Sequence, residues 1–193
     1  MPLRIIACGV FRDALNAIAP GRFRQNVAVS YISPCLHNHP ARLFAEIERQ
    51  IRLARAAKEN VVCVFGQCAP DLDPLLDKLK IPRVPGAHCY EILLSSRRFR
   101  KVMDEEAGTY FLEKELIQNF TDYCVHPLEL DDPMLRESYF QHYKRVAYVR
   151  QPEDPDHMVS RVKDIARMLN LSPITIDADY SELKKNLLKL FSD

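Results

Sequence analysis

The sequence lacks tryptophan and holds only five glycines in 193 residues. Glycine-rich phosphate-binding motifs are also missing. The first strand-like run continues as Cys8-Gly9-Val10-Phe11, with one glycine where dinucleotide-binding folds have GxGxxG. The patterns GxxxxGK[ST], HExxH and GxSxG do not occur either. These absences disfavour a dinucleotide or nucleoside triphosphate cofactor.

The sequence also lacks a large excess of positive or negative charge, and it has no long apolar run. The net charge is +1, which gives no reason to expect a nucleic-acid or membrane surface. No apolar run reaches the roughly 18 residues that a membrane-spanning helix needs. The N-terminal residues lead directly into a strand-like run and do not resemble a signal peptide. We therefore expect a cytoplasmic protein without nucleic-acid or membrane partners. Apolar surface on the later helices is compatible with a homodimer.

Short β-rich runs alternate with helical ones along the whole chain. The strand-like runs are Leu3–Ala7, Val27–Ile32, Val61–Phe65, Ile81–Val84, Thr109–Leu112, Arg145–Val149 and Ile174–Ile176. The helical runs are Asp13–Ile18, Pro40–Lys58, Asp71–Leu79, His88–Asp104, Glu113–Asn119, Pro133–Tyr143, Asp156–Leu169 and Ser181–Phe191. This alternation predicts an α/β fold with a doubly wound, mainly parallel sheet and helices on both faces. A single domain over residues 1–193 is expected, and its one plausible subdomain seam lies near 127–133.

Three of the six cysteines follow strand-like runs. Cys8 comes after the first run, Cys68 after Val61–Phe65, and Cys89 after Ile81–Val84. The carboxyl ends of parallel strands form the sheet edge that binds ligands. Thiolates are soft ligands for iron–sulfur clusters or zinc, and three of them leave one position open to a small ligand. The alternative is that these thiols are core or loop residues, because no short CxxC pair is present. Cys63, within an apolar run, is expected in the core.

Other polar residues fall on the same predicted edge or near it. His37 lies in Cys35-Leu36-His37-Asn38-His39-Pro40, directly after the second strand-like run. Gly66 and Gln67 precede Cys68, and His88 precedes Cys89. Thr109 and Tyr110 follow Gly108 at the start of a strand-like run. We predict a ligand pocket formed by His37, Gly66, Gln67, His88, Thr109 and Tyr110, although each of them also has a plain structural interpretation.

Several sequence blocks resemble domain-of-unknown-function family 1638. They are Ile6-Ala7-Cys8-Gly9, Leu36-His37-Asn38-His39-Pro40, Phe65-Gly66-Gln67-Cys68, Pro82-Arg83-Val84, Cys89–Ser96 and Gly108–Leu112. They are similar to the ACG, LHxxP, YGxCG, PR, C…LLGS and GTYYL blocks of that family. The run 143–148 is similar to a later segment. The chain departs from the family pattern at three positions. Phe65 stands where the family has Tyr, and Ala69 and Ser95 stand where it has Gly.

The resemblance implies cysteines at the positions of Cys8, Cys68 and Cys89, in agreement with the argument from the sheet edge. Members of the family are found largely in anaerobic bacteria and archaea, sometimes beside corrinoid-dependent methyl-transfer proteins. That association implies anaerobic metabolism with metal or tetrapyrrole chemistry.

Three hypotheses follow, and they leave open whether the protein is an enzyme. The first is an iron–sulfur protein, or a zinc protein with His37 or His88 as a further ligand, whose open position binds a small molecule. The second is a corrinoid- or tetrapyrrole-binding accessory protein with His37 or His39 as axial ligand. The third is a thiol enzyme in which Cys89 is the nucleophile and His37 or His88 the base.

Overall fold

The computed structural model describes residues 2–18 and 26–190, and the chain divides into two compact units. The first unit comprises Met1–Ile92 and Tyr180–Asp193, and the second comprises Leu93–Asp179. Each unit has its own three-stranded parallel sheet with helices. The expected α/β class with parallel strands is confirmed, and the strands are distributed over two sheets. The 127–133 stretch lies inside the second unit. The single domain over 1–193 stays a prediction.

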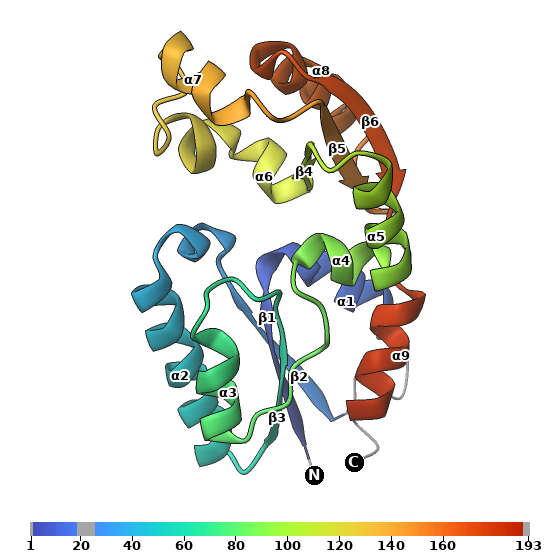
Figure 1. The fold of residues 1–193 in the computed structure, drawn as a ribbon. Helices are drawn as coiled ribbons and strands as arrows, with labels where there is room; N and C mark the ends of the chain where they lie inside the picture. The colour runs from blue at the N-terminus through green and yellow to red at the C-terminus, as the bar shows by residue number, and fades with distance from the viewer. Residues whose placement is uncertain (1, 19–25, 191–193) are drawn as a thin grey trace. The chain divides into compact units, whose positions relative to one another are not determined.

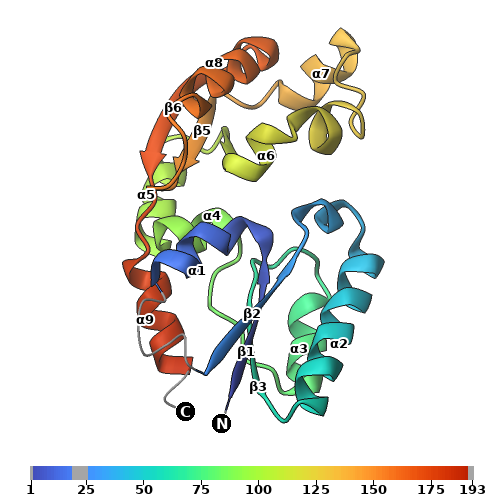
Figure 2. The same cartoon turned by 180° about the vertical axis from the view of Figure 1, so that it is seen from behind.

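The first unit contains a sheet in the order β2-β1-β3 between two helical layers (Figures 1 and 2). Its elements are β1 (Leu3–Cys8), η1 (Gly9–Phe11), α1 (Arg12–Ile18), β2 (Val27–Ile32), η3 (Pro34–Asn38), α2 (Pro40–Ala56), β3 (Asn60–Val64), α3 (Leu72–Leu79), the start of α4 (Cys89–Leu94) and α9 (Ser181–Leu190). Helices α2 and α3 cover one face of the sheet, and α1 and α9 the other. Both faces of the sheet are therefore buried, which explains why β3 is apolar almost throughout.

Helix α2 follows directly from its sequence. Pro40 occupies the first turn, where its missing N–H has no partner to lose. Leu43, Ile47 and Ile51 repeat at helical spacing and are all buried against the sheet. The helix ends at Ala56, just before Lys58 adopts a left-handed φ of 57°. Most of the stability of this helix therefore comes from the stripe that it buries.

The second unit has a sheet in the order β4-β5-β6. Its elements are α5 (Ser96–Glu105), β4 (Thr109–Leu112), α6 (Lys114–Gln118), the π-helical turn η4 (Thr121–Val125), α7 (Pro133–Phe140), β5 (Arg145–Arg150), α8 (Met158–Leu169) and β6 (Ser172–Asp177). Val146 and Tyr148 of β5 point into a core shared with α6, α7 and α8. On the opposite face Phe99 of α5 packs against Phe111, with ring centroids 5.2 Å apart.

Two predicted elements differ from the structure. The run Ile81–Val84 contributes only an isolated parallel bridge between Arg83 and Cys63, since Pro82 cannot donate to a ladder. The predicted helix His88–Asp104 is two helices, α4 and α5, separated at Ser95. Ser95 has φ 74° and ψ 149°, a conformation that favours glycine, and its side chain accepts a hydrogen bond from Arg98 N as the N-cap of α5. This strained position is one of the three at which the chain departs from the family pattern.

We expect Ser95→Gly to raise the free energy of unfolding by about 1 kcal/mol, because a strained non-glycine residue costs about 1–3 kcal/mol and glycine loses only a few tenths at an N-cap. Thermal unfolding should shift upward by about 2–4 °C. Ser96→Gly is the matched control, since Ser96 lies inside α5 and glycine is unfavourable in a helix. A Ser95→Gly variant that melts at or below the temperature of Ser96→Gly would contradict this account.

Candidate functional site

The carboxyl end of β1 carries the first cysteine of the predicted set. Cys8 is the last residue of the strand and pairs in register with Ile32 at the end of β2. A Cβ on the next residue, Gly9, would lie 2.9 Å from the Pro34 ring, so the chain after β1 passes directly beside the start of η3. The close approach brings the segment with Cys35 and His37 to the same sheet edge as Cys8.

The loop after β3 lies against the segment that precedes α4. Gln67 N donates to Ala87 O at 2.7 Å. A Cβ on Gly66 would lie 2.8 Å from Cys89 N and 3.0 Å from the His88 carbonyl carbon. The backbone on either side of this contact carries Cys68 and Cys89, so two of the three predicted cysteines belong to segments in direct contact, the loop after β3 and the start of α4.

Arg83 holds these two loops together. Its guanidinium donates to both carboxylate oxygens of Asp73, at 2.7 and 3.1 Å. It also donates to the carbonyls of Phe65 and Gly86 at 2.8 Å and of Val84 at 3.1 Å. The Asp73 carboxylate in turn accepts from Gln67 Nε2 at 3.1 Å. One side chain therefore joins the end of β3, the segment before α4 and the first turn of α3.

The cysteines of this edge differ in burial. Cys8 and Cys68 are half-buried and pack with Leu36 against the core beneath α2. Burial raises the pKa of the Cys68 thiol, and the nearby Arg83 partly offsets this rise. Cys63 is fully buried in β3, as expected, and burial raises its pKa to about 12. Cys68 is therefore a protonated thiol at neutral pH, with no thiolate charge to make it a nucleophile.

Although His37 is an exposed residue of η3, its imidazole is partly withdrawn from water. Burial lowers the pKa of His37, and the electrostatic effect of His88 lowers it further. His88 is thus near enough to act electrostatically on His37, although His37 is in η3 and His88 lies just before α4. A lowered pKa keeps His37 neutral at pH 7, which is the form that binds metals or accepts a proton.

Within the ranges 2–18 and 26–190, no three His, Cys, Asp or Glu side chains are placed to hold a metal ion. The carboxyl edge of the first sheet therefore brings together the segments that carry Cys8, His37, Gly66, Gln67, Cys68, His88 and Cys89, without assembling their side chains into a ligand set.

Thr109 and Tyr110 belong to the second unit, where their hydroxyl groups have internal partners. Thr109 is buried, donates to Glu106 O and accepts from Arg145 Nε at 2.8 Å. The Tyr110 hydroxyl lies 3.4 Å from Cys124 Sγ, and its ring packs edge-on against Phe140. Burial raises the pKa of Tyr110, with Cys124 as the next cause.

The structure also shows residues that the sequence analysis did not single out. Arg83 lies in the Pro82-Arg83-Val84 block. Its position after a proline in a short apolar run is the one feature of the sequence that indicates a special role for it. Asp73 gave no signal beyond an acidic residue in the first turn of a helix.

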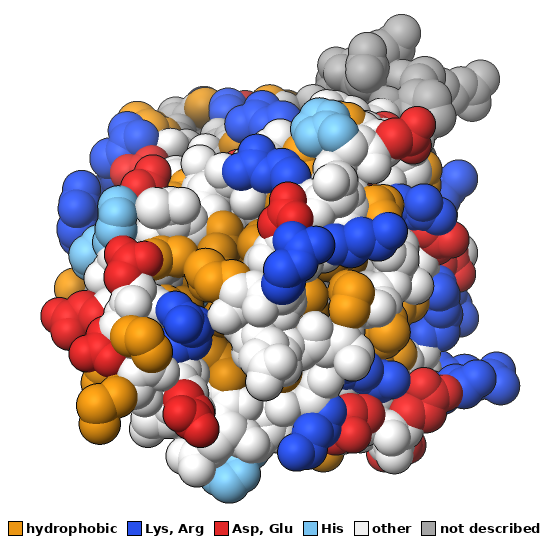
Figure 3. Space-filling model, turned by 90° about the horizontal axis from the view of Figure 1, so that it is seen from above, with side chains coloured by type: hydrophobic (Ala, Val, Ile, Leu, Met, Phe, Trp, Pro, Cys, Tyr) orange, Lys and Arg blue, Asp and Glu red, His pale blue; other side chains and the backbone are white. Residues whose placement is uncertain are grey.

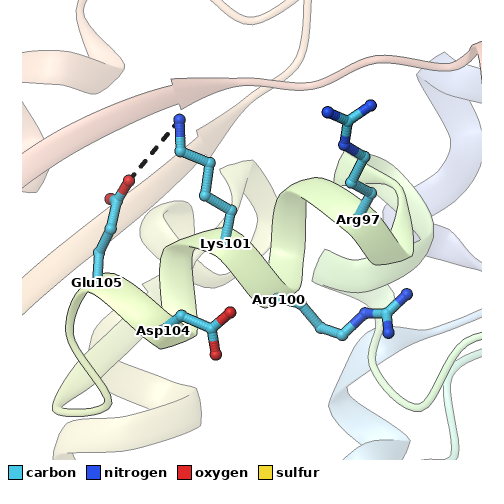
Figure 4. A pocket seen from close by; sticks show the side chains of 5 residues that line it. All are labelled: Arg97, Arg100, Lys101, Asp104 and Glu105. Atoms are coloured by element: carbon cyan, nitrogen blue, oxygen red, sulfur yellow. Dashed lines mark ion pairs between the residues drawn. The ribbon is translucent and has the colours of Figure 1, made fainter.

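The basic run in α5 lines a surface cavity of about 470 Å³ together with two acidic residues (Figure 4). Arg97, Lys101 and Glu105 extend from one side of the helix, and Lys101 Nζ lies 3.9 Å from Glu105 Oε1. The remaining lining residues are Arg100 and Asp104. Figure 3 likewise shows Lys and Arg side chains among Asp and Glu side chains on the face in view. Because α5 carries four basic and two acidic residues, the acidic pair compensates only part of the positive charge, and the pattern is that of a solvated basic helix face.

A family model described as "Protein of unknown function (DUF1638)" matches residues 31–187, which confirms the resemblance seen in the sequence. No curated protein and no solved structure matches the chain. No helix within the part of the chain that the structure describes is long and apolar enough to cross a membrane.

Proposed function

The chain belongs to the DUF1638 family, and from this premise we propose that its first unit binds a metal centre through Cys8, Cys68 and Cys89. The observation that carries the proposal is the contact of the Cys68 loop with the backbone at Cys89, at the sheet edge where β1 ends in Cys8. An iron–sulfur cluster is the favoured centre, and zinc is the alternative.

The donor set has the chemistry that such centres need. Thiolates bind iron–sulfur clusters and zinc, and three protein ligands leave one position for a small molecule. Cys8 ends β1, Cys68 lies in the loop after β3 and Cys89 is the first residue of α4, so none of the three is in the middle of a strand. Because burial raises the pKa of Cys68, binding must release its proton, and uptake should strengthen as the pH rises.

The test is anaerobic purification followed by absorption spectroscopy and elemental analysis for iron, zinc and cobalt. Cys8→Ser, Cys68→Ser and Cys89→Ser should each lower the bound metal at least about tenfold, because each removes a ligand. Cys35→Ser is the matched control, since Cys35 lies near the same edge, in η3, and its Sγ is only 3.0 Å from Ser33 Oγ. A chain that takes up neither iron with sulfide nor zinc would contradict the proposal, as would equal metal content in all four variants.

Neutral His37 beside His88 supports a second candidate, a thiol enzyme. The Cys89 sulfur would add to an electrophilic carbonyl carbon, whose π electron pair moves to the carbonyl oxygen, and one of the two histidines would accept the thiol proton. The rate of Cys89 alkylation as a function of pH tests this candidate. A His37→Gln substitution that leaves the pH profile of alkylation unchanged excludes His37 as the base.

A neutral imidazole is also the form that can bind the cobalt of a corrinoid. Binding through His37 or His39 would change the absorption spectrum of added cobalamin, and His37→Gln and His39→Gln would separate the two. An unchanged cobalamin spectrum excludes this role.

A further inference from the structure

Helix α7 carries an apolar patch on its outer side. Of the five large apolar side chains that are exposed in the described part of the chain, three lie on this eight-residue helix. Met134 is 81% exposed, Tyr139 51% and Leu135 37%. The inner side of the helix is already packed, since Phe140 is buried in the core of the second unit and contacts the Tyr110 ring edge-on. An exposed apolar cluster of this kind indicates an interaction surface.

The surroundings of this patch are acidic. Four exposed acidic residues lie on α7 or within the four residues before it: Glu129, Asp131, Asp132 and Glu137. In the part of the chain that the structure describes, none of the four forms an ion pair. Arg136, the one basic residue of α7, donates to the Leu130 carbonyl at 2.7 Å. A partner that covers this patch should therefore bring positive charge beside its own apolar surface.

Helix α5 has the complementary chemistry. Four of its first six residues are basic: Arg97, Arg98, Arg100 and Lys101. Three of the four line the surface cavity of about 470 Å³, and of the residues drawn in Figure 4 only Lys101 forms an ion pair, with Glu105. Arg97 and Arg100 are exposed and have no ion-pair partner among the described residues. The cavity thus offers room for a side chain, uncompensated positive charge and the apolar stems of two arginines.

These two surfaces belong to opposite faces of the second sheet. Phe99 of α5 packs against Phe111, whereas Phe140 of α7 packs against the preceding strand residue, Tyr110. Successive residues of a strand point to opposite faces of the sheet. The α7 patch therefore cannot reach the α5 cavity of its own unit, and the complementary surface must come from another molecule.

We propose that the α7 patch of one molecule docks on α5 of a second copy of this chain. Met134 and Tyr139 enter the α5 cavity, where the tyrosine ring stacks on an arginine guanidinium, and the acidic residues around the patch pair with the remaining basic side chains. Tyrosine, methionine and arginine are the residue types that are enriched in the cores of protein interfaces. The inference is independent of the metal proposal, because both surfaces lie in the second unit.

The contact joins two different surfaces, so it is heterologous. Each molecule in a pair keeps one free α5 surface and one free α7 surface, and further copies add head to tail into a ring or a chain. The acidic and basic side chains around the contact stay near water, so salt screens their attraction. Association should therefore be stronger at about 10 mM salt than at about 1 M salt.

Sedimentation velocity of the full chain over a range of concentrations, at low and at high salt, measures this association. Arg97→Glu with Arg100→Glu should weaken it at least about tenfold, because like charges then face each other across the contact. Arg42→Glu with Arg52→Glu is the matched control, since it changes the net charge equally at two exposed positions of α2. The control should associate as the wild type does.

A second variant tests the other side of the contact. Met134→Ser with Tyr139→Ser removes the two apolar side chains and should also sediment as a monomer, while its exposed positions leave the melting temperature near that of the wild type. Each double variant retains one intact surface. An equimolar mixture of the α5 and α7 variants should therefore form pairs and nothing larger.

Three results would overturn the proposal. One is a wild-type chain that stays monomeric at every concentration at low salt, which would leave the α7 patch to a different occupant. Another is association of either double variant as strong as that of the wild type, because a different surface would then be responsible. The third is an equimolar mixture of the two variants that contains only monomers.

Discussion

Replacing Arg83 with alanine is expected to lower the free energy of unfolding of the first unit by about 3 kcal/mol, because charged hydrogen bonds contribute about 1.5–3 kcal/mol each and removing one partner leaves the others unsatisfied. The Arg83 side chain is 14% exposed, and it is the partner of the Asp73 carboxylate and of three backbone carbonyls. The Asp73 side chain is 36% exposed, so water takes over part of its interactions and keeps the loss at this level. Thermal unfolding should shift downward by about 6–12 °C.

One further variant separates the geometry of Arg83 from its charge, and a second is a control for the loss of an exposed ion pair. Arg83→Lys keeps the cation but cannot reach Asp73 and three carbonyls at once, so its melting temperature should fall between wild type and alanine. Arg49→Ala removes a similarly short ion pair to Glu46 on the exposed side of α2, where water screens the charges, so its melting temperature should stay close to that of the wild type. Equal destabilisation by Arg83→Ala and Arg49→Ala would show that Arg83 does not hold the loops together.

If the first unit binds a metal, metal uptake is a second property that Arg83→Ala should change. Arg83 donates to the carbonyls of Phe65 and Gly86, which precede Cys68 and Cys89 by three residues each. It is therefore a positioning residue. We expect Arg83→Ala to weaken metal uptake at temperatures where the first unit is still folded, whereas Arg49→Ala should leave uptake unchanged.

Local patterns in the sequence predict most of the elements because their signals are local too. The stripe of Leu43, Ile47 and Ile51 predicts α2 almost to its ends, and the β-branched run before Phe65 predicts β3. The division of the strands into two sheets has no such signal. The alternation of strands and helices along the sequence is the same whether three or six strands share a sheet. Only the long-range pairing of strands determines how many sheets form. The break at Ser95 was hidden because amphipathic residues continue on both sides of it.

The candidate site, too, is predicted from the sequence only where its signals are local. The ends of strands can be predicted from a sequence, and this places Cys8, the loop with Cys68 and the start of the helix with Cys89 at one edge. The importance of Arg83 cannot be read in this way, since its partners lie 1 to 18 residues away along the chain and are mostly backbone carbonyls. Asp154 likewise gives no signal in the sequence, because its partners in the structure are the Tyr148 hydroxyl and the Lys114 ammonium group, which lie on other elements.

Gly66→Ala is expected to lower the free energy of unfolding by about 1–3 kcal/mol, the range found when an extra methyl group is forced into a packed site. The new Cβ would lie 2.8 Å from Cys89 N, 3.0 Å from the His88 carbonyl carbon and 3.1 Å from His88 Cα. All three atoms are backbone, so no side-chain rotation relieves the contact. The segment with His88 and Cys89 must move away from the Cys68 loop, and thermal unfolding measures the cost.

Gly108→Ala is the matched control for this variant, because its Cβ would lie 2.5 Å from a backbone atom, His142 O, in the second unit. Both variants should therefore be destabilised. Only Gly66→Ala should also lower metal uptake or change the rate of Cys89 alkylation, since only that residue separates two cysteine-bearing segments. If both glycine variants lose stability and neither changes those readouts, the contact at Gly66 serves packing alone, and the proposal that the three cysteines act together loses its main support.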